Sequence, residues 1–336
     1  MMIRFCKIAF LLGLVCLLYG CQTGSSEPIM DKLVYGSFSD EQNIKTIPLD
    51  YSSGSVQRDI KGEPKKYAYL KQVDIFRMGY ISDGLFVTGF IAKPHAEGLF
   101  PVIVYNRGGF EKTDCLTPEI AINELASLAA EGYIVVASNY RGSCGSDGKD
   151  EFGGDDINDV INLLGSLHEI KGADTSRIGM MGRNRGGMMT FKAMRNNPRI
   201  KCAVVTGGIT NLQRTTQHNK RIENLLLQFV PEYKSNAQDV IDCRSVVQWA
   251  QEIPKKSPVL VMHGTDDKEV PYDDAVEVCG KFARANAQFK LIAFRKDDNS
   301  LSRHKDTAFR FTINWFNAYL KEGIPFSEKS HSEVID

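Results

Sequence analysis

Residues 178–190 constrain the fold of this chain more than any other stretch. They run Ile-Gly-Met-Met-Gly-Arg-Asn-Arg-Gly-Gly-Met-Met-Thr, so apolar residues lead into a Gly-x-x-x-Gly corner and a helix-compatible segment follows. Glycines let the backbone turn tightly at such a corner. A strand that becomes a helix over so few residues presents the central residue of the corner, here Asn184, at the end of the strand.

This layout is that of a nucleophile elbow, the turn that exposes a catalytic side chain above a sheet. The nucleophile position, where serine is expected, holds Asn184. Asparagine accepts a positive φ at modest cost, so we expect the turn to persist. Its amide cannot be deprotonated near neutral pH and provides no nucleophile, so the chemistry of the corner is lost.

The remaining periodicity predicts an α/β protein whose parallel sheet is covered on both faces. Residues 67–76 and 85–92 alternate as an antiparallel hairpin at the leading edge of the sheet. Apolar strands are expected at 101–105, 133–138, 201–206, 259–262 and 289–294, and helices at 120–130, 155–170, 274–285 and 305–320. Residues 209–255 have helical patterns without a strand and predict a helical insertion.

The amino terminus has the pattern of an exported lipoprotein. A basic start precedes an apolar run over residues 8–18, which is too short to span a bilayer as a mature helix. The run ends in Leu-Tyr-Gly-Cys, which resembles a bacterial lipobox and predicts lipidation of Cys21; an ordinary secretory signal with a chance cysteine is the alternative. With residues 22–28 as a polar tether, we expect a lipid anchor that holds the protein to a bilayer of the bacterial cell envelope, periplasmic or surface-facing.

Composition and cysteine spacing argue against several classes of partner. The 336 residues carry 41 basic and 41 acidic side chains without a block of like charge, so no nucleic acid is expected as a partner. The cysteines beyond Cys21 show no paired spacing, which predicts neither a zinc site nor a disulfide framework. Cys144 lies in a glycine-rich loop, where a thiol nucleophile would need a histidine partner. We expect no metal and no other cofactor.

Several motifs, in the correct order, resemble those of the prolyl oligopeptidase family of serine peptidases. They are Tyr-Asn-Arg-Gly-Gly-Phe at 105–110, Asn-Tyr-Arg-Gly-Ser-Cys-Gly-Ser-Asp-Gly at 139–148, Phe-Gly-Gly-Asp-Asp-Ile-Asn-Asp-Val at 152–160, the elbow, and His-Gly-Thr-Asp-Asp-Lys-Glu-Val-Pro at 263–271. The resemblance spans residues 67–322 and implies the α/β-hydrolase fold, a mostly parallel doubly wound sheet. We expect no room for the family's propeller domain in these 336 residues.

The predicted organisation has four parts. Residues 1–20 are a lipoprotein signal peptide, 21–65 a tether and amino-terminal segment, 66–322 the α/β-hydrolase domain with its insertion at 209–255, and 323–336 a carboxyl-terminal tail.

The resemblance also implies the positions of a catalytic triad. Serine, aspartate and histidine follow in that order, each after a strand. The serine position falls on Asn184, the acid on Asp267 and the histidine position on Asn299. His304, five residues later, is a candidate substitute base, and a surface or helix-start role is its alternative.

The oxyanion hole follows from the same resemblance. Its backbone donors are those of Arg185, Arg107, Gly108 and Gly109. The arginine side chains have two interpretations: they bind an anionic ligand group at a pocket mouth, or they form ion pairs with loop aspartates such as Asp147 or Asp155.

The sequence therefore predicts a pseudohydrolase, a lipoprotein that binds a small peptide- or ester-like ligand or a partner protein. The competing hypothesis is an active serine-peptidase-type or esterase-type hydrolase that uses His304 and another nucleophile, such as Cys144 or a nearby serine. A third hypothesis, a purely structural domain, predicts a filled pocket.

Overall fold

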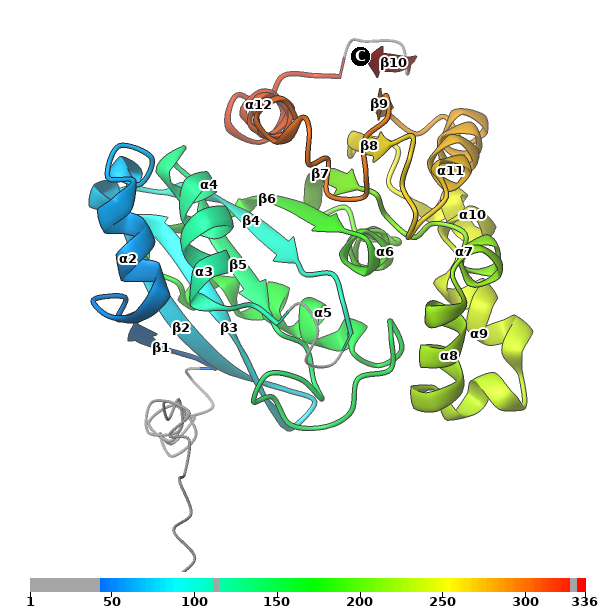
Figure 1. The fold of residues 1–336 in the computed structure, drawn as a ribbon, viewed down its shortest axis with the longest axis horizontal. Coiled ribbons are helices and arrows are strands. Elements are labelled where there is room, and N and C mark those ends of the chain that lie inside the picture. The colour runs from blue at the N-terminus through cyan, green and yellow to red at the C-terminus, as the bar shows by residue number, and fades with distance from the viewer. Residues whose placement is uncertain (1–42, 111–114, 327–330) are drawn as a thin grey trace, which may run out of the picture.

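The computed structural model describes residues 43–110, 115–326 and 331–336 (Figure 1). The predicted signal peptide, Cys21 and the tether lie outside the described residues. No helix in these described ranges is both long enough and apolar enough to cross a membrane.

A single twisted sheet forms the centre of the fold (Figure 1). Its strands are β1 (Ile44–Pro48), β2 (Val73–Ser82), β3 (Leu85–Pro94), β4 (Phe100–Asn106), β5 (Ile134–Ser138), β6 (Ala173–Arg183), β7 (Ile200–Thr206), β8 (Val259–Gly264), β9 (Phe289–Phe294) and β10 (His331–Ile335). Their spatial order is β1-β2-β3-β5-β4-β6-β7-β8-β9-β10. The pairs among β1, β2, β3 and β5 are antiparallel, and every pair from β5 onward is parallel.

Helices cover both faces of the sheet, and the sheet separates two hydrophobic cores. One core includes buried side chains of α5 (Ile157–Ser166), α6 (Arg185–Met194) and α11 (Tyr272–Arg284). The other includes side chains of α2 (Gly54–Gly62), α4 (Ala126–Ala130) and α12 (Lys305–Phe316). The strands between them are apolar on both sides, as strands of a doubly covered parallel sheet must be.

The insertion at 209–255 is helical. It contains α7 (Leu212–His218), α8 (Lys220–Phe229), α9 (Ala237–Arg244) and α10 (Val246–Trp249). Figure 1 shows these helices gathered at one side of the molecule, next to α11. The architecture is the predicted α/β-hydrolase fold: a mostly parallel sheet with an amino-terminal antiparallel hairpin and a helical insertion.

Three details differ from the predicted elements. The first hairpin strand begins at Val73 rather than 67, because residues 68–72 form a 3-10 turn. The hairpin is not the sheet's edge, since β1 pairs with β2 on its outer side. The expected carboxyl-terminal tail contains β10, which adds to β9 in parallel. Both outer strands are five residues long, too short for a clear period-2 pattern.

Candidate functional site

The elbow forms between β6 and α6, with Asn184 at its corner. Asn184 has φ 53° and ψ −121°, the positive φ that such a corner demands. Added Cβ atoms would lie 2.1 Å from the Gly186 carbonyl oxygen at Gly182, and 2.0 Å from the Asn106 carbonyl oxygen at Gly186. Only glycine fits at either position, which explains the Gly-x-x-x-Gly signature.

The side chain of Asn184 turns back onto the start of α6. Its Oδ1 accepts a hydrogen bond of 2.7 Å from the Arg185 backbone N–H, the group expected to serve in the oxyanion hole. Because an N–H faces this oxygen, the amide orientation is fixed, and Nδ2 is left facing elsewhere. Within the described residues Nδ2 has no acceptor, so Asn184 carries a free donor at the corner.

The acid position is built on the turn after β8. Asp267 Oδ1 accepts from the N–H groups of Glu269 and Val270 at 2.8 and 3.0 Å, and Oδ2 accepts from Asn299 Nδ2 at 2.8 Å. The Nε2 atom of buried His263 lies 3.1 Å from the same Oδ2. Burial alone would raise the pKa of Asp267, but the hydrogen bonds from His263, Val270 and Asn299 outweigh it and hold that pKa below its ordinary value.

The structure brings the nucleophile, acid and base positions together at the end of β7. The Asn184 N–H donates to the Thr206 carbonyl at 3.1 Å, and Asn299 Nδ2 lies 3.3 Å from the next carbonyl, that of Gly207. A Cβ at Gly207 would lie 2.6 Å from Asn299 Nδ2 and 3.2 Å from Asp267 Oδ2. Asn184, Asp267 and Asn299 therefore surround one backbone segment at the carboxyl ends of the parallel strands.

His304 belongs to a neighbouring pair. Its Nδ1 lies 2.8 Å from Oδ2 of the fully buried Asp297, and its ring lies 5.4 Å from that of Phe294. Among the described residues His304 forms no hydrogen bond or ion pair with Asp267 or Asn184. It occupies the residue before α12, the helix-start role named as the alternative.

The side chains of Arg107 and Arg185 lie beneath the elbow rather than at a pocket mouth. Arg185 is fully buried and donates to both oxygens of Asp150, at 2.8 and 2.6 Å, and to Asp156. Arg107 is 1% exposed, donates to the Asn139 carbonyl at 2.8 Å and lies 3.9 Å from Asp150. Both arginine side chains therefore lie next to loop aspartates, as the second of the two interpretations predicts.

The acids in this network correct the prediction in one respect. They are Asp150 and Asp156, not Asp147 or Asp155. Asp147 instead accepts from the Phe86 N–H, and the Asp155 N–H donates to Glu151. Asp156 precedes α5, and its carboxylate also accepts from the Gly153 N–H. Within one acidic loop, sequence alone does not show which carboxylates face inward.

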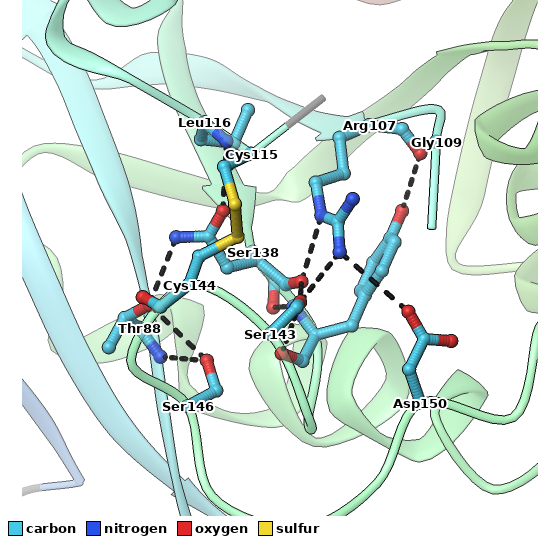
Figure 2. Close-up of a disulfide and its surroundings, with 12 residues drawn as sticks. Thr88, Arg107, Gly109, Cys115, Leu116, Ser138, Ser143, Cys144, Ser146 and Asp150 are labelled. Carbon is cyan, nitrogen blue, oxygen red and sulfur yellow. Dashed lines mark hydrogen bonds and ion pairs between the residues drawn. A yellow bond between two sulfur atoms is a disulfide. The ribbon is translucent and has the colours of Figure 1, made fainter. Parts of the chain in front are cut away.

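Cys115 and Cys144 form a disulfide, which corrects the prediction that no disulfide would occur (Figure 2). The cysteines are 29 residues apart, with Cα atoms 5.9 Å from each other. One follows β4 and the other follows β5, and these strands are parallel neighbours whose ends, Asn106 and Ser138, lie in register. The strand order was the signal that could have predicted the bond. In this form Cys144 has no free thiol and cannot be a nucleophile.

The disulfide also lies close to the arginine network. Figure 2 shows Cys144 on the same loop as Ser143, whose hydroxyl oxygen accepts from Arg107 Nη2 at 2.6 Å. On the other side of the bond, the Leu116 N–H donates to Asn139 Oδ1 at 3.0 Å. The loops after β4 and β5, which approach the elbow, are thus joined by a covalent bond and by hydrogen bonds.

Comparisons with known proteins agree with this geometry. The prolyl oligopeptidase family matches residues 118–323. The uncharacterized peptidase YtmA of Bacillus subtilis is 25% identical over 201 residues, which cover 60% of this chain and 76% of YtmA. The uncharacterized peptidase YuxL of the same organism is 25% identical over 297 residues, 82% of this chain but 43% of YuxL.

Solved structures share the fold. An acylaminoacyl peptidase of Pyrococcus horikoshii superimposes with a TM-score of 0.64 at 22% identity, covering 81% of this chain and 44% of the peptidase. The chain thus spans less than half the length of YuxL and of this peptidase.

Proposed function

The chain belongs to the prolyl oligopeptidase family, and on that basis we propose that it is a catalytically degenerate member that binds a peptide- or ester-like ligand without cleaving it. The observation that carries the proposal is the pair of amides at the triad positions. Asn184 occupies the elbow corner, and Asn299 donates to Asp267 where the family's histidine would stand.

Neither amide can perform its part of an acyl transfer. A carboxamide nitrogen is not a nucleophile near neutral pH, and the Asn299 amide cannot take a proton from an attacking group. Removing triad members leaves only about 10³- to 10⁴-fold acceleration from binding and the oxyanion hole. In this protein the Arg185 N–H, the expected oxyanion-hole donor, already donates to Asn184 Oδ1. It is therefore not free to bind an oxyanion, which lowers even the remaining activity.

The amides leave a pattern that suits a peptide bond. Asn184 presents its free Nδ2 donor, and Asn299 presents Oδ1 as an acceptor because its Nδ2 is bound to Asp267. Both residues are partly exposed. A peptide unit offers one carbonyl acceptor and one N–H donor, whereas an ester offers no donor. Among peptide- and ester-like ligands, this complementarity favours the peptide.

Turnover measurements on the purified protein test the loss of catalysis. An aryl ester and an aminoacyl anilide are compared in the natural protein, Asn184→Ser, Asn299→His and the double variant. We expect turnover above background only in the double variant. Asn286→Ser, at an exposed asparagine with a φ of 55°, controls for the same substitution at a left-handed position remote from the site.

The competing hypothesis is a hydrolase with a displaced base. Its support is the buried Asp297 beside His304, which orients an imidazole as a catalytic acid would. Robust turnover by the natural protein that disappears in His304→Ala or in Ser302→Ala would establish this hypothesis and defeat the first. Equal background rates in all three proteins would exclude it.

We also propose that the protein is exported and lipid-anchored through Cys21. The lipobox-like sequence supports this, and so does the Cys115–Cys144 disulfide, because such bonds persist in oxidising compartments and are rare in the cytosol. Labelling of expressing bacteria with a fatty-acid analogue should mark the natural chain. A Cys21→Ala chain should carry no label, and label on that variant would refute anchoring at this residue.

A further inference from the structure

A concave region lies at the opposite end of the parallel strands from Asn184. A cavity of about 620 Å³ is lined by residues that begin or precede parallel strands, including Arg177 in β6, Lys201 in β7 and Lys256 before β8. Its other wall is residues 319–326, which comprise the end of the last helical segment (Asn317–Lys321) and the chain that follows it. The candidate functional site is at the carboxyl ends of the same strands, so this cavity is separate from it.

The wall formed by the last segment is held in place by contacts within that segment. Gly323 has φ 62° and ends the helical segment, and the Ile324 N–H donates back to the Ala318 carbonyl at 2.8 Å. The chain then returns so that the Phe326 ring lies 5.7 Å from Tyr319 and 6.0 Å from Trp315. These rings give the cavity a packed apolar side before any ligand arrives.

The opposite side carries cations that the protein does not fully neutralise. Four basic residues line the cavity, against one acid, Glu322. Arg177 is paired with Asp174 at 2.6 Å. Among the residues that the structure describes, Lys201 Nζ donates only to the Pro198 carbonyl, at 3.4 Å.

The other two basic residues of the lining, Lys321 and Lys256, differ in their contacts with the protein. Lys321 contacts the Glu131 carbonyl and lies 4.3 Å from the Tyr133 ring centre. Lys256 has no hydrogen bond or ion pair with any residue in the described part of the chain. Lys201 and Lys256 thus offer positive charge beside an apolar wall.

We propose that this cavity binds a small amphiphilic anion, with a carboxylate or phosphate head toward Lys201 and Lys256 and an apolar body against Tyr319 and Phe326. The volume lies within the range of small-molecule sites and is too small for a folded partner or a nucleic acid duplex. An anion gains from cations that have no internal partner, and an apolar body gains from leaving water for the aromatic wall. The site does not depend on whether Asn184 is catalytic.

Decanoate is a suitable probe, and the protein supplies its own reporter. Of the two tryptophans, Trp315 contacts the cavity wall through Tyr319, with ring centres 4.6 Å apart, so Trp249→Phe leaves one reporting tryptophan. Fluorescence titration and calorimetry with monomeric decanoate should both give saturable binding. Decyltrimethylammonium, which has the same tail and the opposite charge, should not bind.

A matched pair of variants tests the location. Lys256→Glu should weaken decanoate binding about tenfold or more, a loss of one well-placed charge contact and the gain of a repulsive one. Lys255→Glu makes the same charge change at the adjacent exposed residue, which does not line the cavity, and should leave the affinity unchanged. Equal effects of the two variants, or none, would overturn the site.

Two further measurements distinguish a small soluble anion from a phospholipid headgroup as the ligand. Inorganic phosphate should compete only weakly because it lacks the apolar body. Sedimentation with phosphatidylglycerol vesicles that depends on Lys256, with no binding of monomeric decanoate, would show a membrane contact and overturn the small-molecule proposal. Binding of decanoate that saturates and depends on Lys256 supports it.

Discussion

Basic side chains have different partners at the two ends of the parallel strands. At the carboxyl ends, Arg185 is fully buried and its guanidinium is bound by Asp150 and Asp156. At the amino ends, Lys201 and Lys256 are exposed and lack a carboxylate partner in the described residues. The first arrangement holds loops in place, whereas the second leaves charge available to a ligand.

The difference separates structural charge from functional charge. A buried guanidinium that is bound by two carboxylates cannot recognise a ligand without breaking its own network, and its removal leaves those carboxylates buried without their partner. An exposed unpaired lysine contributes little to folding and has little to lose on binding. Stability measurements should therefore distinguish the two ends, with effects that decrease from Arg185 to Lys256.

The largest loss is expected from Arg185→Met. The substitution leaves Asp150 and Asp156 buried without the guanidinium that binds both of them, and breaking a buried pair of this kind typically costs about 3–5 kcal/mol. Urea unfolding measures the change. Arg195→Met is the matched control: it lies at the other end of α6 and pairs with Glu252, but 40% of its side chain is exposed. It should lose about 1 kcal/mol or less.

Equal losses in the two arginine variants would contradict the distinction between the ends. A loss confined to Arg185→Met would support it.

The next largest effect is expected from removing the disulfide. The Cys115→Ser, Cys144→Ser double variant opens a loop of 29 residues, for which chain entropy predicts a loss of about 3–4 kcal/mol. Thermal unfolding with and without a reductant measures it. Cys243→Ser, at an exposed free cysteine, should have no comparable effect. If the reductant destabilises the double variant as much as the natural protein, the loss does not come from this bond.

The elements predicted from sequence are those with strong local patterns. The elbow was predicted with its positive φ at Asn184, because glycine spacing and an apolar strand specify that corner together. The strand at β9 was predicted residue for residue, since it is a short apolar run bounded by polar residues. Buried parallel strands have the clearest sequence signal in this class of fold.

What could not be predicted depends on pairing across the fold. Asp150 and Asp156 are two of several acids in one loop, and only the packed structure shows that they face Arg185. Cys115 and Cys144 meet because β4 and β5 are neighbours, which local periodicity does not reveal. The cavity at the amino ends has no motif at all, because its residues come from the starts of separate strands.

A pH-dependent effect of intermediate size is expected from Asp274. It is fully buried in α11, accepts from Thr215 at 2.8 Å and pairs with Arg214, which is itself 36% exposed. The partly exposed Arg214 offsets only part of the cost of burying the Asp274 carboxylate. Burial therefore raises the Asp274 pKa to about 6.

Because the folded-state pKa lies above the unfolded value, the native state binds more protons between about pH 4 and pH 6. This contribution to stability is complete below the unfolded pKa and is lost as pH rises through the folded one. The free energy of unfolding of the natural protein, minus that of Asp274→Asn, should fall by about 2–3 kcal/mol from pH 4 to pH 7. A difference that rises with pH would show that the pKa is lowered instead.

The smallest effect is expected where the comparison is most informative, at Lys256. Removing this side chain breaks no hydrogen bond or ion pair in the described part of the chain and relieves its proximity to the other cations that line the cavity. Lys256→Ala should change the free energy of unfolding by less than about 0.5 kcal/mol, while weakening decanoate binding. Arg177 lines the same cavity but pairs with Asp174. Arg177→Ala breaks that pair and should therefore lower the free energy of unfolding more than Lys256→Ala does. A destabilisation by Lys256→Ala as large as that by Arg177→Ala would mean that this lysine has a structural partner, and charge at the amino ends would then be no freer than charge beneath the elbow.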